Sequence, residues 1–218
     1  MKRINSFSSA LKVILPMVVA APLLIMLAGY LLFSYNSGPD LKTLDSVTLQ
    51  DGDLVFRRGI SIESYAVVMA ASGNIYSHIG LIVIEKGIPF VIHVEPGEIS
   101  GRDKPVQKEP LNSFLGPGKA SHFAIYRSHL DPKDLKKVIS RAREFYLRKC
   151  RFDNAYNLQD DQFLYCTELV LKAYSKGDQQ ISRLLMNLEN INILVYSHKL
   201  LMPGAFTQSN FFYRICNQ

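Results

Sequence analysis

The sequence contains too few cysteines for a disulfide framework. It has three, Cys150, Cys166 and Cys216, and an odd number leaves at least one thiol free. Cys150 and Cys216 could still pair if the protein works in an oxidising compartment. A small fold held together mainly by disulfides is therefore excluded, and each thiol has to be assessed on its own surroundings.

Signatures of metal and cofactor binding are also absent. His122, His129 and His198 have no neighbours at the spacing of metal ligands, and Asp160-Asp161 alone is a poor ligand set. The chain has no glycine-rich loop of the kind that surrounds phosphate groups. We therefore expect neither a metal nor a cofactor.

Acidic residues are missing from the N-terminal part of the chain. The formal net charge is +6, but residues 1–39 carry Lys2, Arg3 and Lys12 and no acid, which leaves 22 basic and 19 acidic residues for the rest. That balance gives no case for nucleic-acid binding. A basic run at residues 141–151 is interpreted as the solvated face of a helix rather than a ligand-binding patch.

Charge is missing altogether from residues 13–33. At 1.5 Å per residue, a helix of this length is about 30 Å long, which is the thickness of a hydrocarbon core. Basic residues precede the stretch and acidic residues follow it, so the positive-inside rule predicts a cytoplasmic segment at 1–12 and a transmembrane anchor at 13–35. A linker at 36–44 and one domain at 45–218 follow, and the domain is expected in the periplasm.

A cleaved signal peptide is the alternative interpretation of this stretch. The apolar run is longer than such a peptide needs, and it ends in Leu31-Leu32-Phe33-Ser34-Tyr35, which offers no good cleavage site. No cysteine follows it, which excludes a lipoprotein anchor. The uncleaved anchor is favoured.

Strands come first in the domain and helices later. This order predicts an α+β fold in which helices pack on an antiparallel sheet. A helix from Asp131-Pro132 has aspartate as N-cap and proline at the first helical position. The expected strands are 52–57, 77–84, 90–95 and 122–127, and the expected helices are 64–72, 131–149 and 164–174.

Cys166 is the candidate nucleophile. It stands in the first turn of the helix expected at 164–174, where the exposed N–H groups and the helix dipole are expected to lower the pKa of the thiol and to stabilise an oxyanion. On position alone, a small buried apolar residue is the stronger interpretation. The balance changes if His78 lies close by as a general base.

His78 belongs to a predicted hairpin that supplies a third polar group. With a two-residue loop at Lys86-Gly87, Glu85 faces Ile88, His78 lies opposite Glu95, and His93 is its diagonal neighbour on the same face. Period-two alternation puts His78 on one face with Gly80, which leaves room for another group to approach. Both His93 and Glu95 could orient the imidazole.

These motifs together resemble the circularly permuted branch of the papain-like NlpC superfamily, specifically the YiiX-like cysteine peptidases and amidases. The resemblance covers about residues 45–212 and is carried by Gly52-Asp53-Leu54-Val55, Ser77-His78-Ile79-Gly80, Phe90-Val91-Ile92-His93, Phe152-Asp153, Tyr165-Cys166-Thr167-Glu168-Leu169-Val170 and the closing Pro203–Ser209 segment.

The resemblance implies a thiol hydrolase with Cys166 as nucleophile, His78 as general base and His93 as the orienting third residue, with Glu95 as the runner-up. Many relatives have glutamate at the third position and serine after the cysteine, so His93 and Thr167 are departures. Glu168 is expected to cap the helix, while Asp53 and Tyr165 could line the cleft.

The substrate expectation is an amide or peptide bond, in a cell-wall peptide for example. Two alternatives stay open: a lipid acyltransferase or deacylase at the membrane surface, and an inactive binding module on the same fold.

Overall fold

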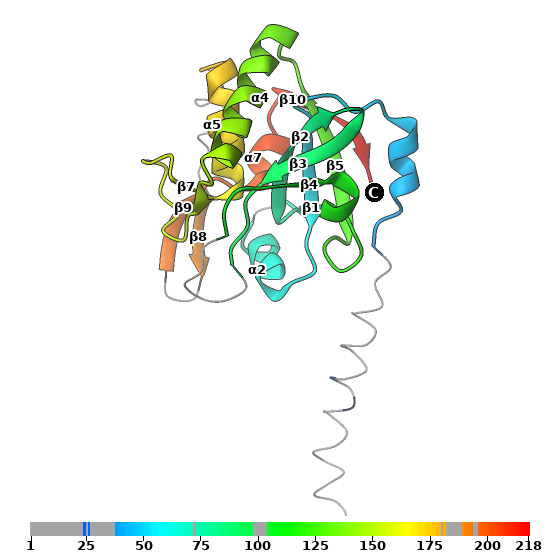
Figure 1. Ribbon diagram of the computed structural model, residues 1–218. Coiled ribbons are helices and arrows are strands. Elements are labelled where there is room, and N and C mark those ends of the chain that lie inside the picture. The colour runs from blue at the N-terminus through cyan, green and yellow to red at the C-terminus, as the bar shows by residue number, and fades with distance from the viewer. Residues whose placement is uncertain are drawn as a thin grey trace, which may run out of the picture. The chain divides into compact units, whose positions relative to one another are not determined.

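The computed structural model describes residues 24, 26, 38–71, 73–97, 104–179, 181, 189–193 and 196–218. Within this part of the chain, a six-stranded sheet has the order β10-β5-β1-β2-β3-β4, with every neighbouring pair antiparallel (Figure 1). Its strands are β1 (Leu54–Arg58), β2 (His78–Glu85), β3 (Ile88–His93), β4 (Gln107–Pro110), β5 (His122–Ser128) and β10 (Phe212–Asn217).

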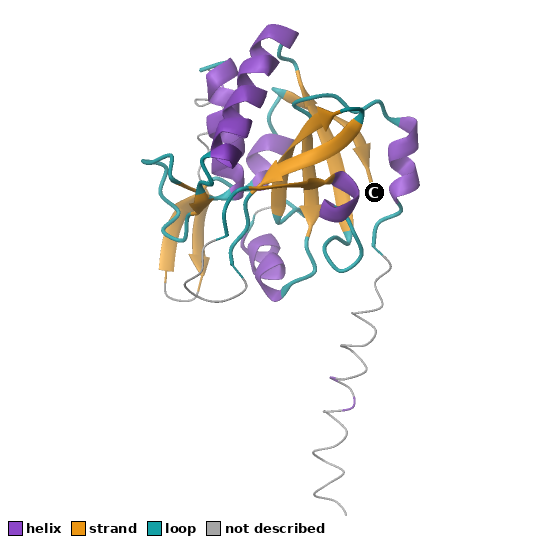
Figure 2. Ribbon diagram, in the orientation of Figure 1, coloured by secondary structure: helices purple, strands orange, loops and turns teal. Residues whose placement is uncertain are grey.

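Helices and two small ribbons complete the domain, and the α+β class expected from the sequence is confirmed (Figure 2). The β6–β7 pair is parallel and the β8–β9 pair is antiparallel. These elements are η1 (Leu41–Ser46), α2 (Ile62–Ala70), α3 (Leu111–Phe114), α4 (Pro132–Leu147), β6 (Arg151–Phe152), β7 (Phe163–Leu164), α5 (Cys166–Gly177), β8 (Glu189–Ile193), β9 (Tyr196–Leu200) and α7 (Pro203–Thr207).

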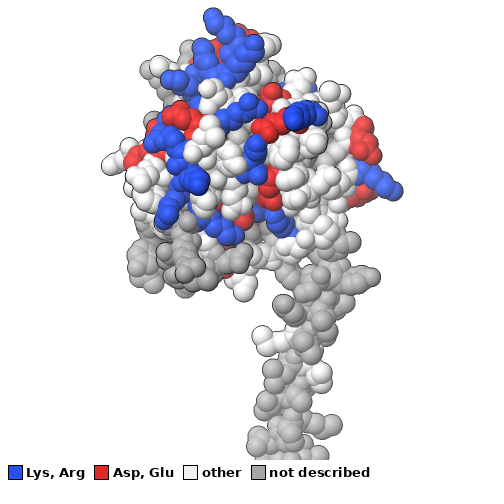
Figure 3. Space-filling view, in the orientation of Figure 1, with Lys and Arg blue, Asp and Glu red and all other residues white. Residues whose placement is uncertain are grey.

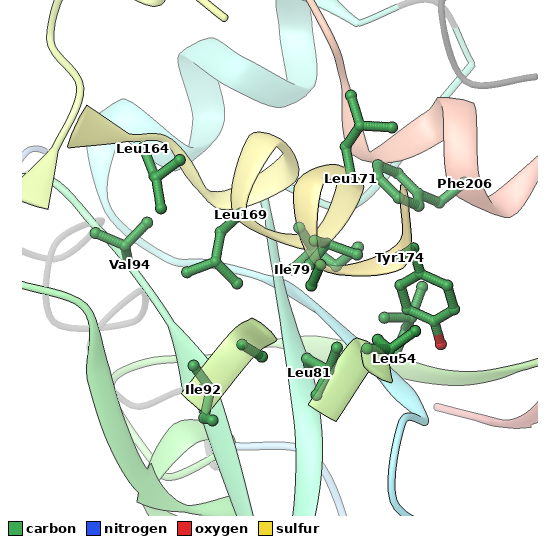
Figure 4. Packing of buried hydrophobic residues seen from close by; sticks show 14 of the residues in the cluster. Leu54, Ile79, Leu81, Ile92, Val94, Leu164, Leu169, Leu171, Tyr174 and Phe206 are labelled. Atoms are coloured by element: carbon green, nitrogen blue, oxygen red, sulfur yellow. The ribbon is translucent and has the colours of Figure 1, made fainter. Parts of the chain in front are cut away.

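The sheet has a separate apolar core on each face, because successive side chains of a strand point to opposite faces. In β2, Ile79 and Leu81 belong to the core under α4 and α5, and Ile82 belongs to the core under α3 and η1. Figure 4 shows Leu169 and Tyr174 of α5 directed toward the strands. The sheet is therefore covered on both faces.

Both long helices begin at polar caps. At α4, the Asp131 side chain accepts a hydrogen bond from Asp134 N–H, and Pro132 follows at the first helical position, as expected from the sequence. At α5, the Tyr165 N–H donates to Glu168 Oε2 at 3.2 Å, so Glu168 caps the helix that carries Cys166. The first turn of α5 is thereby held in place.

The β2–β3 hairpin has the register that the sequence predicted. Lys86 and Gly87 both have positive φ, 53° and 80°, as a type I′ turn requires. Glu85 pairs with Ile88, and the ladder continues to the pair Leu81 and Ile92. This register carries His93 alongside the first residues of β2.

The structure also differs from the sequence expectations, and α3 and the short strands β6 to β9 were not predicted. The helix η1 falls partly within the predicted linker at 36–44, because Asp40 caps it by accepting a hydrogen bond from Lys42 N–H. The edge strands β4 and β10 were not predicted, since 107–110 and 212–217 lack a clear alternation of apolar and polar residues. The free space expected above Gly80 is filled by Val91 and His93.

The predicted segments at 1–12 and 13–35 lie outside the described residues, apart from 24 and 26. Among the helices that the structure does describe, none combines the length and the apolar character needed to span a bilayer. The anchor therefore stays a prediction.

Three arginines of the basic run, Arg141, Arg143 and Arg148, lie beside carboxylates. Arg141 pairs with Glu144 and Asp161, and Arg143 lies 3.6 Å from Glu85. Blue and red side chains are interspersed on this face in Figure 3. This pairing agrees with a solvated helix face.

The two remaining cysteines lie far from a pairing geometry. Cys150 is buried in the core under α4 and α5, and Cys216 packs against the core on the opposite face of the sheet. Both thiols are free. A disulfide between them would require the fold to rearrange.

Gly80→Ala should destabilise the domain by about 1–3 kcal/mol, the usual cost of overpacking. A Cβ built at Gly80 would lie 2.3 Å from Val91 Cγ1 and 3.2 Å from His93 Cβ. Urea unfolding of the full-length chain, followed by circular dichroism, measures the loss. The control is Gly80→Ala with Val91→Ala, which removes the closest atom and should be less destabilised than the sum of the two single variants. If the losses in unfolding free energy of the two single variants simply added in the double variant, the steric explanation would be wrong.

Candidate active site

Cys166 and His78 line the same pocket, which has a volume of about 530 Å³. The pocket lies at the end of the sheet where β1 finishes and β2 begins, and Arg57 pairs with His78 at that end. Cys166 reaches the pocket as the first residue of α5, and His78 as the first residue of β2. The fold thus brings together two residues that are 88 positions apart.

Backbone N–H groups surround the thiol. Those of Ile79, Thr167 and Cys166 itself donate toward Sγ and stabilise the thiolate. The same donors are suited to a developing oxyanion next to the sulfur. The Thr167 hydroxyl donates instead to the Leu201 carbonyl at 2.6 Å, which ties the first turn of α5 to the pocket wall.

The thiol nevertheless stays protonated at neutral pH. Burial raises the pKa of Cys166 to about 11, and this outweighs the three N–H groups and the more distant charge of Arg57. The expectation of a lowered pKa is therefore wrong. That expectation was based on the helix terminus alone. It left out the free-energy cost of burying a charged thiolate, which cannot be assessed from the local sequence.

A chain of hydrogen-bonded side chains starts at His78. Its Nε2 lies 3.0 Å from His93 Nδ1, and His93 Nε2 lies 3.0 Å from Glu109 Oε1. Lys119 Nζ donates to the other oxygen of Glu109 at 2.8 Å. Three strands therefore contribute to one line of polar groups: β2, β3 and β4.

Arg57 lies buried beside the two histidines. It donates to Glu95 Oε2 at 2.7 Å and to the Phe114 carbonyl at 2.8 Å, and its guanidinium lies 4.4 Å from the centre of the Phe114 ring. The same ring packs against both imidazoles. The Phe114 ring thus covers one side of the two hydrogen-bonded imidazoles.

Both imidazoles are neutral at physiological pH. Burial, followed by the charges of Arg57 and His93, holds the pKa of His78 well below its ordinary value of 6.5. Burial and Arg57 also lower the pKa of His93, although Glu109 acts in the opposite direction. Burial works to raise the pKa of Glu109, but hydrogen bonds from His93 and Lys119 hold it at about 2. Glu109 is therefore a carboxylate at the end of a chain of two neutral rings.

The structure also places the other residues that were singled out from the sequence, which are Tyr165, Glu168, Asp53 and Glu95. Tyr165 lines the pocket, and Glu168 is fully buried, with its carboxylate 2.8 Å from Lys172 Nζ.

Asp53 does not line this pocket. It sits at the other end of β1 in an ion pair with Arg127, so its assignment to the cleft was wrong. Glu95, the runner-up for the third position, binds Arg57 and Lys104.

Sequence reasoning missed Glu109 and Arg57. Glu109 lies on β4, two positions from the residue that pairs with His93, so recognising that strand would have found it. Arg57 alternates with Phe56 at the end of β1, and its pairing with His78 follows only from knowledge of which strands are neighbours. Neither residue carries a local sequence signal.

One group among the described residues could hold a metal ion by its donor atoms. His78, His93 and Glu95 each bring a ligand atom within 4.8 Å of the others. Two histidines and one carboxylate form a ligand set that metals use in proteins. These three residues lie too far apart in the sequence for local spacing to indicate a ligand set.

No protein-family model matches the chain, and no curated protein matches its sequence. A solved structure does match: the crystal structure of metalloprotein YiiX from Escherichia coli O157:H7. The two structures superimpose with a TM-score of 0.59 at 19% sequence identity, over 78% of this chain and 97% of that one. The chain has a YiiX-like fold. At this identity, the likeness concerns the fold alone.

Alkylation of Cys166 by iodoacetamide should be slow at neutral pH and should accelerate toward pH 11. Only the thiolate reacts, and a pKa of about 11 leaves a thiolate fraction of roughly 10⁻⁴ at pH 7. Mass spectrometry of full-length protein labelled between pH 5 and 10 measures the rate at each cysteine. Half-buried Cys216 serves as the internal control. A labelling plateau below pH 8 would show a preformed thiolate and contradict the buried neutral thiol.

Proposed function

We propose that the protein is a thiol hydrolase that cleaves an amide, peptide or ester bond through an acyl-enzyme on Cys166. One observation carries the proposal: Glu109, His93 and His78 form a hydrogen-bonded chain that ends in the pocket lined by Cys166. A nucleophile, a base and residues that orient the base are the parts such chemistry needs.

The carboxylate of Glu109 selects the tautomers along this chain. Because Glu109 only accepts hydrogen bonds, His93 carries its proton on Nε2, and its Nδ1 accepts from His78 Nε2–H. The lone pair of His78 is then on Nδ1. His78 is thereby prepared to accept a proton rather than to donate one.

The proposed reaction begins with a neutral thiol and a neutral imidazole. Sγ forms a bond to the substrate carbonyl carbon while His78 Nδ1 takes the thiol proton, and the N–H groups of Ile79 and Thr167 donate to the oxyanion. The bond to the leaving group breaks as His78 returns that proton to the departing nitrogen or oxygen. Water then attacks the thioester, one of its protons passes through His78 to Sγ, and the acid and the thiol are released.

A resident metal does not fit this site, although the YiiX protein is described as a metalloprotein. In this chain, Glu95 is held by Arg57 at 2.7 Å and by Lys104 at 3.4 Å, so both carboxylate oxygens face cations. His78 and His93 use the relevant nitrogens on each other. A divalent cation here would lie beside the buried guanidinium, and no step of the mechanism is assigned to one.

The proposal includes the permuted papain-like assignment and the membrane location. The order His78 before Cys166 and the YiiX-like fold support the former. The uncharged stretch at residues 13–33 supports a single-pass anchor with a periplasmic domain. An inactive binding module on the same fold is the competing reading, and the next experiment separates the two.

Full-length protein should release p-nitrophenolate from p-nitrophenyl acetate with an initial burst of about one equivalent, and Cys166→Ala should lower the rate at least about 10³-fold. Cys150→Ala removes a buried thiol outside the pocket and serves as the control. The rate should fall only below pH 6.5, because His78 accepts the thiol proton only when it is unprotonated and its pKa is lowered. A burst that survives in Cys166→Ala would overturn the assignment, and no burst in the wild type would favour the binding module.

Glu109→Gln should lower kcat at least about tenfold with little change in KM, as expected for a residue that positions another. A glutamine amide can donate to His93 Nε2 and so permits the opposite tautomer. The control is Lys119→Met, which removes the outer, more exposed partner of the same carboxylate and should change kcat less than about twofold. If both variants lowered kcat equally, the loss would come from the charge balance around Glu109 and not from the tautomer of His93.

A further inference from the structure

Three side chains of the kind that bind metals meet a guanidinium around the ring of Phe114. His78, His93 and Glu95 bring their donor atoms within 4.8 Å of one another. Both imidazoles pack on the Phe114 ring, and the Arg57 guanidinium lies 4.4 Å from the centre of the same ring. Arg57 and His78 are also partners in the pairing of β1 with β2. The site thus contains the donors of a cation site and, beside them, a cation that belongs to the chain.

The spacing of the two histidines is close to that of a zinc site. Zinc holds its nitrogen ligands at about 2.0–2.1 Å in a tetrahedral arrangement, so two such nitrogens are about 3.3 Å apart. The facing nitrogens of His78 and His93 are 3.0 Å apart. A carboxylate as third ligand and a water molecule as fourth complete a common type of zinc site. The distances alone would therefore permit a divalent ion, and the neighbouring charge has to decide.

Arg57 holds the carboxylate that such an ion would need. One of its terminal nitrogens donates to Glu95 Oε2 at 2.7 Å, and the other donates to the Phe114 carbonyl at 2.8 Å. Arg57 is only 7% exposed, so water screens its charge poorly. A divalent ion among the three donors would face this charge inside the protein. Repulsion between the two cations therefore opposes metal binding.

Stability alone does not explain an arginine at this position. Its Nε is buried and has no hydrogen-bond partner in the described part of the chain. A buried donor without a partner costs free energy, and a buried ion pair often stabilises a fold less than apolar side chains of similar volume would. A residue with this cost, placed between two histidines and a carboxylate, indicates a role in the site.

We propose that Arg57 is the built-in cation of this site: its guanidinium engages the Glu95 carboxylate, supplies the positive charge that a divalent ion would otherwise bring, and so excludes zinc from His78 and His93. The two imidazoles can then hydrogen-bond to each other instead of sharing a metal. Zinc would need the lone pair of each facing nitrogen and would displace the proton between them. The inference concerns which cation the site accepts, and it does not depend on the proposed reaction.

Removal of the guanidinium should create a zinc site. Arg57→Met keeps a long apolar side chain against Phe114 and removes the charge, while the partly exposed Lys104, 3.4 Å from Glu95, can turn toward solvent. Isothermal titration calorimetry with zinc chloride at neutral pH measures the affinity of the full-length chain, in a Cys166→Ala background so that the pocket thiol supplies no ligand. Arg57→Met should bind one zinc ion at least about a hundredfold more tightly than the chain with arginine, because a poorly screened positive charge is gone.

Two matched variants separate the effect of charge from that of space. Arg57→Lys keeps the positive charge and should leave zinc binding as weak as it is with arginine. Arg57→Met combined with Glu95→Gln removes a ligand and should lose the added affinity. Equal zinc affinity of Arg57→Met and Arg57→Lys would overturn the role given to the charge.

Circular dichroism shows whether each variant is folded. If Arg57→Met is not, Arg57→Gln takes its place, because the amide retains hydrogen-bond donors and carries no charge. A folded neutral variant that binds zinc no better than the chain with arginine would overturn the proposal. Tight zinc binding by the chain with arginine, abolished by Glu95→Gln, would overturn it as well. This last comparison keeps Arg57 in place and is independent of the folding of the substituted variants.

Discussion

The hydrogen bond between His78 and His93 is the interaction on which the arrangement of the site depends, and the register of one hairpin creates it. A shift of one residue would turn His93 to the opposite face. The tight Lys86-Gly87 turn prevents that shift, and the missing side chain at Gly80 allows Val91 and His93 to approach β2 closely. The geometry of the two histidines is thus a consequence of backbone pairing rather than of loop conformation.

Burial decides the charge state of the site. The same apolar surroundings that raise the pKa of Cys166 to about 11 lower the pKa of His78, and the nearby Arg57 adds to the second effect. A thiolate–imidazolium pair would need both shifts to be reversed, so the resting site contains two neutral groups. In the proposed reaction, charge develops only as the thiol attacks, and the N–H groups around Sγ can then stabilise it without first reorganising water. Arg57 is itself compensated by Glu95, which keeps the cluster close to neutral.

The parts of the site that depend on local sequence pattern could be predicted. Period-two alternation and a glycine turn predicted the hairpin and the closeness of His78 and His93, and the helix pattern placed Cys166 in a first turn. Local pattern gave no indication where the outcome depends on distant segments. Glu109 belongs to a short polar edge strand without alternation, and the pKa of Cys166 is set by a pocket whose walls come from residues 63 to 203. Burial by distant segments has no signature in a local window.

One end of the sheet concentrates the functional features because of how the strands run. β1 ends there, and β2 and β5 begin there, so Arg57, His78 and the loop beside Gly38 converge although they are far apart in sequence. The helix that follows β1 at this end is α2, and its Val67 and Ala70 pack near Met202 and Leu200 in one wall of the pocket. The segment that follows β1 therefore closes the pocket beside His78, while the helix α5 brings Cys166 to it from a distant part of the sequence. The pocket is a product of strand order, because α2 and α5 are far from each other along the chain.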